Sequence, residues 1–200
     1  MPTIWQTSRI HVIAAFLALN CGVSLAFGDV GKRYQFKWST KETLVVAVEP
    51  KSVGVDVKIN ENTYRLNLDS PTAQSLRTAA ILHQLGQQPS TMDKENAVVF
   101  VARYPSQRKN PMGRCGTGYE DFLLLFGFDQ KKFRLRDKFL LQSCLQTLAL
   151  APDGEDDPID IVKLASNKPL QIQATWLAHP KYGNSDKTIV IRNKRFETYP

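Results

Sequence analysis

The sequence contains few of the residues that carry out chemistry in most enzymes. Of its 200 residues, three are cysteines and three are histidines. His83 and His179 belong to no His-x-x-x-His pair and the chain has no Cys-x-x-Cys pair, so it does not predict a structural zinc site. It also lacks the Gly-x-Ser-x-Gly segment that marks the nucleophile of many hydrolases. No complete catalytic, metal or nucleotide motif is therefore present.

Apolar runs long enough to span a membrane are also missing. The run from Ile10 to Ala26 covers roughly 17 residues, fewer than the ~20 that a spanning helix needs, and Asn20 interrupts it. Arg9 precedes the run, and Ser24-Leu25-Ala26 has the small-x-small pattern that a signal peptidase recognises. We predict that residues 1–26 are a cleaved export signal and that residues 27–200 form one exported domain, in the periplasm or outside the cell.

Two alternatives for this segment remain open. A retained membrane anchor would need a longer apolar run. A lipoprotein would be acylated at Cys21, but this cysteine follows Asn20 instead of a small residue. The sequence favours the cleaved signal over both.

Positive charge exceeds negative charge in the mature chain. Residues 1–26 hold one of the 26 Lys and Arg residues and none of the 19 Asp and Glu residues, so removing them lowers the formal net charge from +7 to +6. Such a molecule is drawn to anionic surfaces. No run of basic residues interleaved with aromatics predicts nucleic-acid binding. We expect the partner to be a protein that is acidic at its contact surface, with an anionic envelope polymer as the alternative.

Cleavage would leave two cysteines in a compartment where thiols oxidise, and the sequence predicts a Cys115–Cys144 disulfide. Closing a loop of about 30 residues would stabilise the fold by roughly 3.5 kcal/mol on the chain-entropy model. The alternative is a reactive cysteine, which would need one thiol kept free beside a histidine.

Short alternating segments dominate the rest of the chain and predict strands. The expected strands are 34–38, 44–48, 53–59, 64–68, 97–104, 122–128, 133–136, 139–150, 170–176, 189–192 and 195–199. Polar turns at 60–62, 129–132 and 193–194 predict hairpins. The fold class that follows is α+β with a mainly antiparallel sheet, because helices are too few to cover parallel crossovers.

One helix is expected, over residues 71–86. Asp69-Ser70-Pro71 supplies a capping side chain and a proline for the first turn, and Gly86 is the expected stop. Leu76, Ala79, Ala80 and His83 recur at helical spacing, which predicts that one helix face lies on the sheet.

The segment from Arg103 to Asp121 is the most promising functional loop. It combines four positive charges, three glycines and Cys115 between two strands. We expect Arg108, Lys109 and Arg114 to offer donors to carboxylate or phosphate groups, with Tyr119 as a rigid aromatic contact. A solvated strand connection, stapled by its cysteine, is the alternative interpretation.

Two other motifs are weaker. Gly116-Thr117-Gly118 precedes an apolar strand instead of opening a helix, so it does not predict a phosphate site. The acidic residues at 153–157 and Asp160 lack the spacing of a calcium loop, which favours a solvated turn. The sequence therefore predicts no cofactor and no metal.

Functional expectations follow by elimination. The leading hypothesis is a non-catalytic envelope protein that binds another protein, as an inhibitor or immunity protein blocking a cell-wall hydrolase or a delivered toxin. One rival is an envelope hydrolase with a dispersed site of His83 or His179 with Glu120 or Asp121, although adjacent strand residues point to opposite faces. The other rival is a structural protein that binds anionic glycan or lipid.

Overall fold

The computed structural model describes residues 31–37, 39, 41–49, 51–92, 95–106, 115, 118–129, 131–151, 162–167 and 170–200, with the backbone alone at 87–92 and 163–167. The predicted signal sequence, Cys21 and the acidic segment 153–160 lie outside these residues. So do Arg108, Lys109 and Arg114 in the basic loop.

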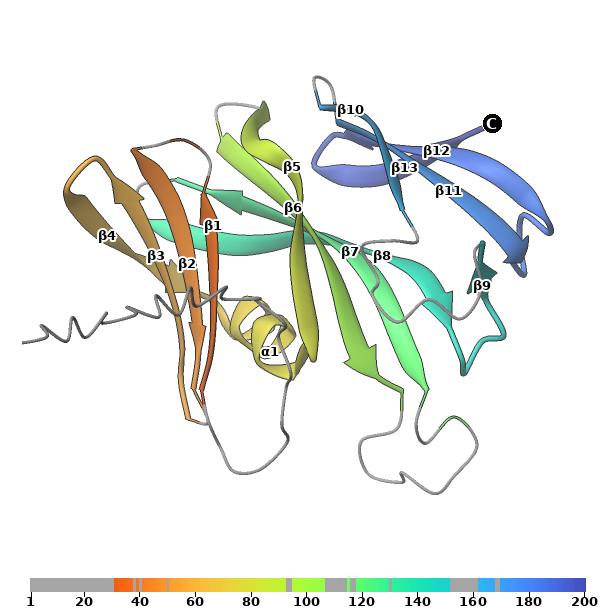
Figure 1. Ribbon diagram of the computed structural model, residues 1–200, viewed down its shortest axis with the longest axis horizontal. Coiled ribbons are helices and arrows are strands. Elements are labelled where there is room, and N and C mark those ends of the chain that lie inside the picture. The colour runs from red at the N-terminus through yellow and green to blue at the C-terminus, as the bar shows by residue number, and fades with distance from the viewer. Residues whose placement is uncertain are drawn as a thin grey trace, which may run out of the picture.

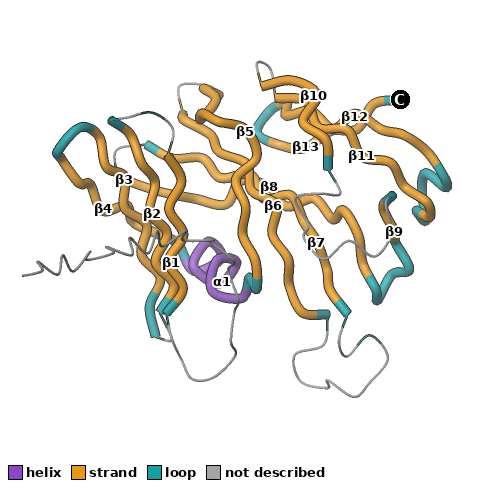
Figure 2. The backbone as a smooth tube through the Cα atoms, viewed as in Figure 1, coloured by secondary structure: helices purple, strands orange, loops and turns teal. Residues whose placement is uncertain are grey.

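Strands make up most of the described chain, together with one short helix (Figures 1 and 2). The elements are β1 (Lys32–Lys37), β2 (Glu42–Val48), β3 (Val53–Ile59), β4 (Asn62–Leu68), α1 (Ser70–Thr78), β5 (Ile81–Met92), β6 (Glu95–Pro105), β7 (Tyr119–Phe128), β8 (Lys132–Ser143), β9 (Ala149–Leu150), β10 (Lys163–Asn167), β11 (Leu170–Ala178), β12 (Ser185–Arg192) and β13 (Arg195–Tyr199).

The strands form two sheets. The first has the order β1-β2-β3-β4-β8-β7-β6-β5, and the second has the order β10-β11-β12-β13 with β9 beside β11. Every pair is antiparallel except β4 with β8, which meet in parallel over two residue pairs, Asn67 with Lys132 and Leu68 with Phe133. The predicted class, a mainly antiparallel sheet with one packed helix, is found in this form.

The first sheet curls until its two outer strands approach each other, so that it is nearly a barrel (Figure 1). The Lys32 ammonium, on β1, donates hydrogen bonds to the carbonyl oxygens of Ala79 and Ala80, just before β5, at 3.3 and 3.0 Å. Helix α1 lies at one end of this curled sheet and packs Leu76 into its interior.

Strands β6 and β7 are buried on both faces because each face covers a different hydrophobic core. The even-numbered side chains of β6, including Phe100, join a core with α1 and strands β1 to β4. The odd-numbered ones, including Val99 and Val101, join a second core with the second sheet. Trp176 anchors that second core, where it is fully buried and its indole N–H donates to the Leu141 carbonyl at 2.8 Å.

The predicted helix is correct at its start and wrong at its end. Asp69 caps it by accepting a hydrogen bond from the Thr72 N–H at 2.9 Å, and Pro71 lies in the first turn. The helix ends at Thr78, however, and the chain continues from Ile81 as strand β5.

Pairing with a distant strand explains the error. Residues 81–85 form an antiparallel ladder with residues 99–103 of β6, which a local periodicity cannot reveal. Of the predicted helix face, Leu76 and Ala79 enter one core, from the helix and from the connection after it. Leu82 of β5 joins them there instead of Ala80 and His83, which are half-buried. Gly86 does not end a helix; it has a φ of 81° beside the point where the β5–β6 register shifts.

Most of the predicted strands and the three predicted hairpins are present. The structure joins the expected strands 133–136 and 139–150 differently, as one strand to Ser143, a turn and the short strand β9. The turn at 129–132 connects β7 to β8, and the turn at 60–61 connects β3 to β4.

Candidate binding site at the disulfide end

The connection between β6 and β7 is held closed at its base. The Ser106 N–H donates to the Gly118 carbonyl at 3.0 Å, and the Gly118 N–H donates to the Cys115 carbonyl at 3.1 Å. Ser106 also donates its hydroxyl hydrogen to Glu120 at 2.6 Å. The described residues on either side of 107–114 are therefore held together. We call this base, with the loop that it carries and the adjacent end of β8, the disulfide end.

The predicted disulfide is confirmed. Cys115 and Cys144 are bonded, with 5.8 Å between their Cα atoms and a separation of 29 positions in sequence. Cys144 immediately follows β8, and its N–H donates to the Tyr119 carbonyl at 3.3 Å. The bond thus ties Cys115 of the β6–β7 connection to the end of a third strand, β8.

Gly118 has a packing reason to be glycine. A Cβ atom at this position would lie 2.9 Å from the Cys144 Cβ and 3.0 Å from its sulfur. Contacts that short do not occur between real Cβ atoms, so any larger residue would push the disulfide away. One of the three loop glycines is therefore explained by close approach instead of by ligand binding.

Two large apolar side chains are exposed beside the disulfide. Tyr119 is 47% exposed at the start of β7, and Leu145 is 52% exposed in the turn that follows Cys144. The Arg103 guanidinium lies 4.9 Å from the centre of the Tyr119 ring, which places a cation against the aromatic face. The predicted binding residue Tyr119 is thus solvent-accessible and supported from within.

Arg103 itself is not a loop cation. It lies opposite Asp121 on the antiparallel pair β6–β7, and it donates from Nε and Nη2 to the two carboxylate oxygens, each at 2.8 Å. Gln142 on β8 donates to the same carboxylate at 2.7 Å. The Arg103 side chain is 5% exposed and that of Asp121 is not exposed at all, so this polar ladder is sealed beneath the disulfide end.

The neighbouring carboxylate, Glu120, has a different environment. It accepts from the Ser106 hydroxyl and, at 3.4 Å, from the Leu145 N–H. Asp121 therefore joins β6, β7 and β8 beneath the loop, whereas Glu120 holds the loop end at Ser106 and the turn after Cys144. The sequence suggested that Arg103 is one of four loop charges. The one local signal against this was that Arg103 falls within the predicted strand 97–104, and only the register of β6 and β7 shows that it lies opposite Asp121.

Lys138 lies on the other face of the same strands. Its ammonium is 3.7 Å from the centre of the Phe122 ring and 4.3 Å from that of Tyr104. Burial of this group lowers the lysine pKa, and the negative charge of Glu120 acts in the opposite direction. The side chain as a whole remains exposed, so only its charged tip is shielded.

One candidate histidine lies in the first sheet, and the other follows a strand of the second. His179 follows β11, and its Nδ1 accepts hydrogen bonds from the backbone N–H groups of Lys181 and Tyr182 at 2.9 and 3.1 Å. Its ring stacks on Tyr182, and partial burial, followed by the positive charge of Lys181, lowers the histidine pKa. His83 is a half-buried residue of β5 that pairs with Val101. Within the described residues, neither is hydrogen-bonded to Glu120 or Asp121.

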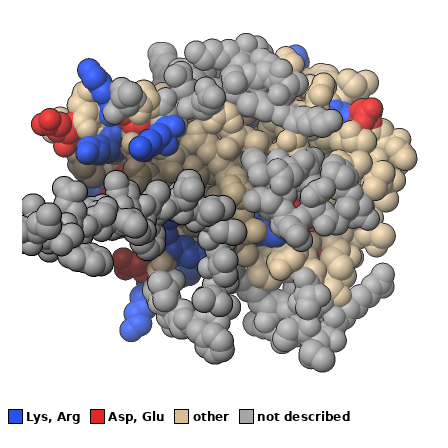
Figure 3. Space-filling model, in the orientation of Figure 1, with Lys and Arg blue, Asp and Glu red and all other residues tan. Residues whose placement is uncertain are grey.

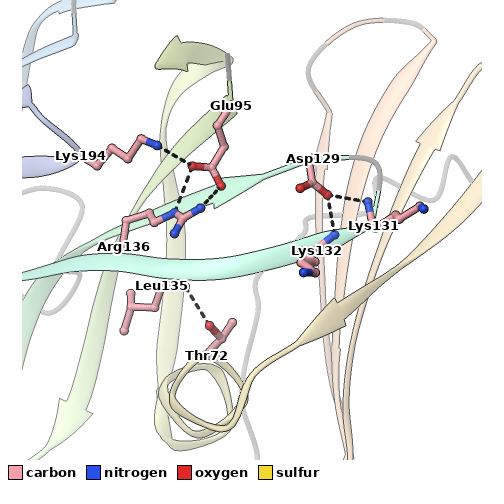
Figure 4. Close-up of polar contacts among 8 residues, drawn as sticks. All are labelled: Thr72, Glu95, Asp129, Lys131, Lys132, Leu135, Arg136 and Lys194. Atoms are coloured by element: carbon pink, nitrogen blue, oxygen red, sulfur yellow. Dashed lines mark hydrogen bonds and ion pairs between the residues drawn. The ribbon is translucent and has the colours of Figure 1, made fainter. Parts of the chain in front are cut away.

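A second charged cluster joins the two sheets (Figure 4). Glu95 on β6 binds the guanidinium of Arg136 on β8. Lys194, in the turn between β12 and β13, places its ammonium 3.7 Å from the same carboxylate. Gly127 makes room for it, since a Cβ there would contact the Glu95 carboxylate. The residues are far apart in sequence, so no local pattern could have predicted this contact.

In the part of the chain that the structure describes, no group of three or more His, Cys, Asp and Glu residues is placed to hold a metal ion. Nor does any helix of that part have the length and hydropathy needed to cross a membrane.

The chain matches no protein-family model, no curated protein and no solved structure. Arg108, Lys109 and Arg114 lie outside the described residues, and their role stays a prediction. What the structure adds is their setting, between the anchored residues Ser106 and Cys115.

Proposed function

We propose that the mature chain is an exported, non-catalytic domain that binds another protein through its disulfide end. In its concrete form it is an inhibitor or immunity protein that blocks a cell-wall hydrolase or a delivered toxin. The disulfide agrees with an exported protein, because thiols oxidise outside the cytoplasm.

The observation that carries the proposal is the tethering of a basic loop at both of its ends. Backbone hydrogen bonds close the loop at Ser106 and Gly118, and the disulfide fixes Cys115 to the end of β8. Fixing the two ends of a loop lowers the conformational entropy that its chain can lose when it binds. This arrangement therefore favours presentation of the loop to a partner.

The exposed side chains at this end suit a protein contact. Tyr119 and Leu145 offer apolar area beside the disulfide, and tyrosine is one of the residues that contribute most to binding energy at interfaces. The Arg103 guanidinium supports the Tyr119 ring from below, and the ladder with Asp121 keeps that guanidinium in place. Tyr119 thus serves as a rigid anchor at the centre of the proposed contact.

Charge selects the class of partner. Arg108, Lys109 and Arg114 lie between the two anchor points, in a chain whose formal net charge is +7 before signal removal. Positive side chains at the rim of an interface accelerate association with an acidic surface. The acidic cleft of a hydrolase or toxin fits this requirement.

The first experiment is a pull-down with oxidised residues 27–200 from envelope and secreted fractions at two salt concentrations. We expect a single stoichiometric protein, identified by mass spectrometry, whose enzymatic activity falls when the complex forms. Salt-labile capture of glycan or lipid without fixed stoichiometry would overturn the proposal.

The second experiment locates the contact on the partner so obtained. The triple variant R108A/K109A/R114A should lower the association rate about tenfold and weaken its dependence on salt. The matched control removes three exposed lysines from the opposite end of the first sheet, K37A/K41A/K58A, and should leave the rate nearly unchanged. Equal effects of the two triple variants would show that net charge, and not the disulfide end, controls binding.

A further inference from the structure

Strands β4 and β8 pair over only two residue pairs, so each strand has a free edge beyond that point. The two edges have different surroundings in the described chain. Beyond this pair, β8 continues alongside α1, and the Leu135 N–H on its outer edge donates to the Thr72 hydroxyl of the helix at 2.8 Å (Figure 4). Thr72 is fully buried, so the helix covers this edge. On the other side of the pair, β4 runs on toward Asn62 with no such cover among the described residues.

On this side, backbone groups of β4 have no strand partner among the described residues. The Asn67 N–H points away from β3, since it donates to the Lys131 carbonyl at 2.7 Å. Backbone groups alternate in direction along an antiparallel strand, so those of Thr63 and Arg65 point the same way as those of Asn67. Both residues are exposed, and within the described chain β4 pairs only with β3 and, at Asn67 and Leu68, with β8.

An apolar pocket lies beside the open edge. It has a volume of about 220 Å³, and its walls come from the β3–β4 hairpin on one side and from the ends of β6 and β7 on the other. The residues that line it are Val57, Ile59, Tyr64, Leu66, Asn96, Phe128 and Asp129. Two of them, Ile59 and Tyr64, are large apolar side chains that lie beside the pocket and are 40% and 44% exposed.

Lysines flank the inner end of the open edge. The Asp129 carboxylate accepts the backbone N–H groups of Lys131 and Lys132 at 2.7 and 2.8 Å, and these two bonds lower the Asp129 pKa and fix the turn (Figure 4). Both lysines are exposed, and no described residue forms an ion pair with either ammonium. Charged side chains also gather over the β3–β4 hairpin in the space-filling view (Figure 3).

We propose that the outer edge of β4 and this pocket together bind an extended segment of a second protein. The segment adds to β4 as a strand, with its backbone bonded to Thr63 and Arg65 and every second side chain directed into the pocket beside Tyr64. Those inward side chains are apolar, and an acidic residue of the segment pairs with Lys131 or Lys132. This surface lies at the opposite end of the first sheet from the disulfide end, so it is independent of the proposed function.

The test uses a fluorescein-labelled nine-residue peptide that alternates valine and threonine and carries a glutamate at each end. Fluorescence anisotropy measures binding to residues 27–200, and ¹⁵N NMR reports on the amides of Thr63 and Arg65. We expect saturable binding, protection of these two amides from hydrogen exchange, and weaker binding when the glutamates are replaced by lysines.

Variants of β4 separate strand addition from simple filling of the pocket. Thr63→Pro removes the outward N–H while leaving the bonds to β3 in place, since proline is tolerated on an edge strand. It should weaken peptide binding about tenfold, because an unpaired acceptor is left in the complex. Thr63→Ala keeps the N–H and should bind like the parent protein.

Peptides N-methylated on alternate residues provide the reciprocal test. Methylation of the edge that faces β4 should abolish binding, and methylation of the other edge should not. Three results would overturn the proposal: no binding at millimolar peptide, equal binding by the Thr63→Pro and Thr63→Ala proteins, or occupation of the β4 edge by a second copy of the chain without peptide, detected as a dimer by sedimentation.

Discussion

Two arginine–aspartate pairs in the first sheet have the same chemistry and opposite surroundings. Arg103 lies directly across from Asp121 on β6 and β7, and Arg65 lies directly across from Asp56 on β4 and β3. Contact distances are similar, 2.8 Å in the first pair and 3.0 Å in the second. The side chains of the first pair are 5% and 0% exposed, however, and those of the second are 61% and 25% exposed.

The difference shows that burial, and not the pairing itself, decides what such a contact contributes. Water already solvates the exposed pair, so its partners lose little when they separate. The buried pair has no such alternative, and either charge left alone would be desolvated without compensation. We therefore expect substitutions of the buried pair at the disulfide end to destabilise the fold more than substitutions of the exposed pair near β4.

The largest expected effect comes from breaking the buried pair. Asp121→Ala leaves the Arg103 guanidinium buried without the carboxylate that balances its charge, and should lower the free energy of unfolding by about 3–5 kcal/mol in urea titrations. The double variant R103M/D121L removes both charges and should recover most of that loss. If the double variant is as unstable as the single one, lost packing and not an unpaired charge is the cause.

Removal of the disulfide should have the next largest effect. The variant C115S/C144S opens a closed loop and should lower the free energy of unfolding by about 2–4 kcal/mol. Dithiothreitol should produce the same shift in the parent protein and none in the variant. An unchanged midpoint of denaturation would mean that the hydrogen bonds at Ser106 and Gly118 hold the loop base without the disulfide.

The exposed pair is the matched control for the buried one. Asp56→Ala should change the free energy of unfolding by at most about 1 kcal/mol, because Arg65 can be solvated. The same urea titration serves both aspartates. A loss as large as that of Asp121→Ala would contradict the comparison on which these predictions rest.

The smallest effect concerns His179 and the acidity of the solution. Burial, and then the positive charge of Lys181, lower the pKa of His179 in the folded state below its ordinary value of about 6.5. As the pH falls through that value, His179 of the unfolded chain therefore takes up a proton before His179 of the folded chain does. The contribution of His179 to stability is therefore present above that pH and is lost as the pH falls toward the folded-state value. NMR titration of the His179 ring should give a midpoint below that of an unfolded peptide, and His179→Asn should remove this part of the pH dependence.

Prediction from sequence succeeded where a signal is local. Alternation revealed most of the strands and the hairpins, and Asp69 with Pro71 revealed where the helix begins. The helix end was missed because residues 81–85 meet helical spacing and strand pairing equally well, and only the distant ladder with β6 decides between them.

In the candidate site, too, local features could be predicted and long-range contacts could not. The chain itself showed Tyr119, the two cysteines and a basic loop between strands. It did not show that Arg103 is buried against Asp121, that Gly118 packs against the disulfide, or that Glu95 meets Arg136 and Lys194. Each of these contacts joins residues that only the register of the sheets brings together.

The sequence by itself determined most of the strands, where the helix starts and which cysteines pair, because these outcomes depend on periodicity, on capping and on the small number of thiols. The tertiary structure alone decided which charges are buried and which strand edges remain open. Burial and edge exposure depend on which distant segments pack against a strand, and a local sequence pattern carries no information about those contacts.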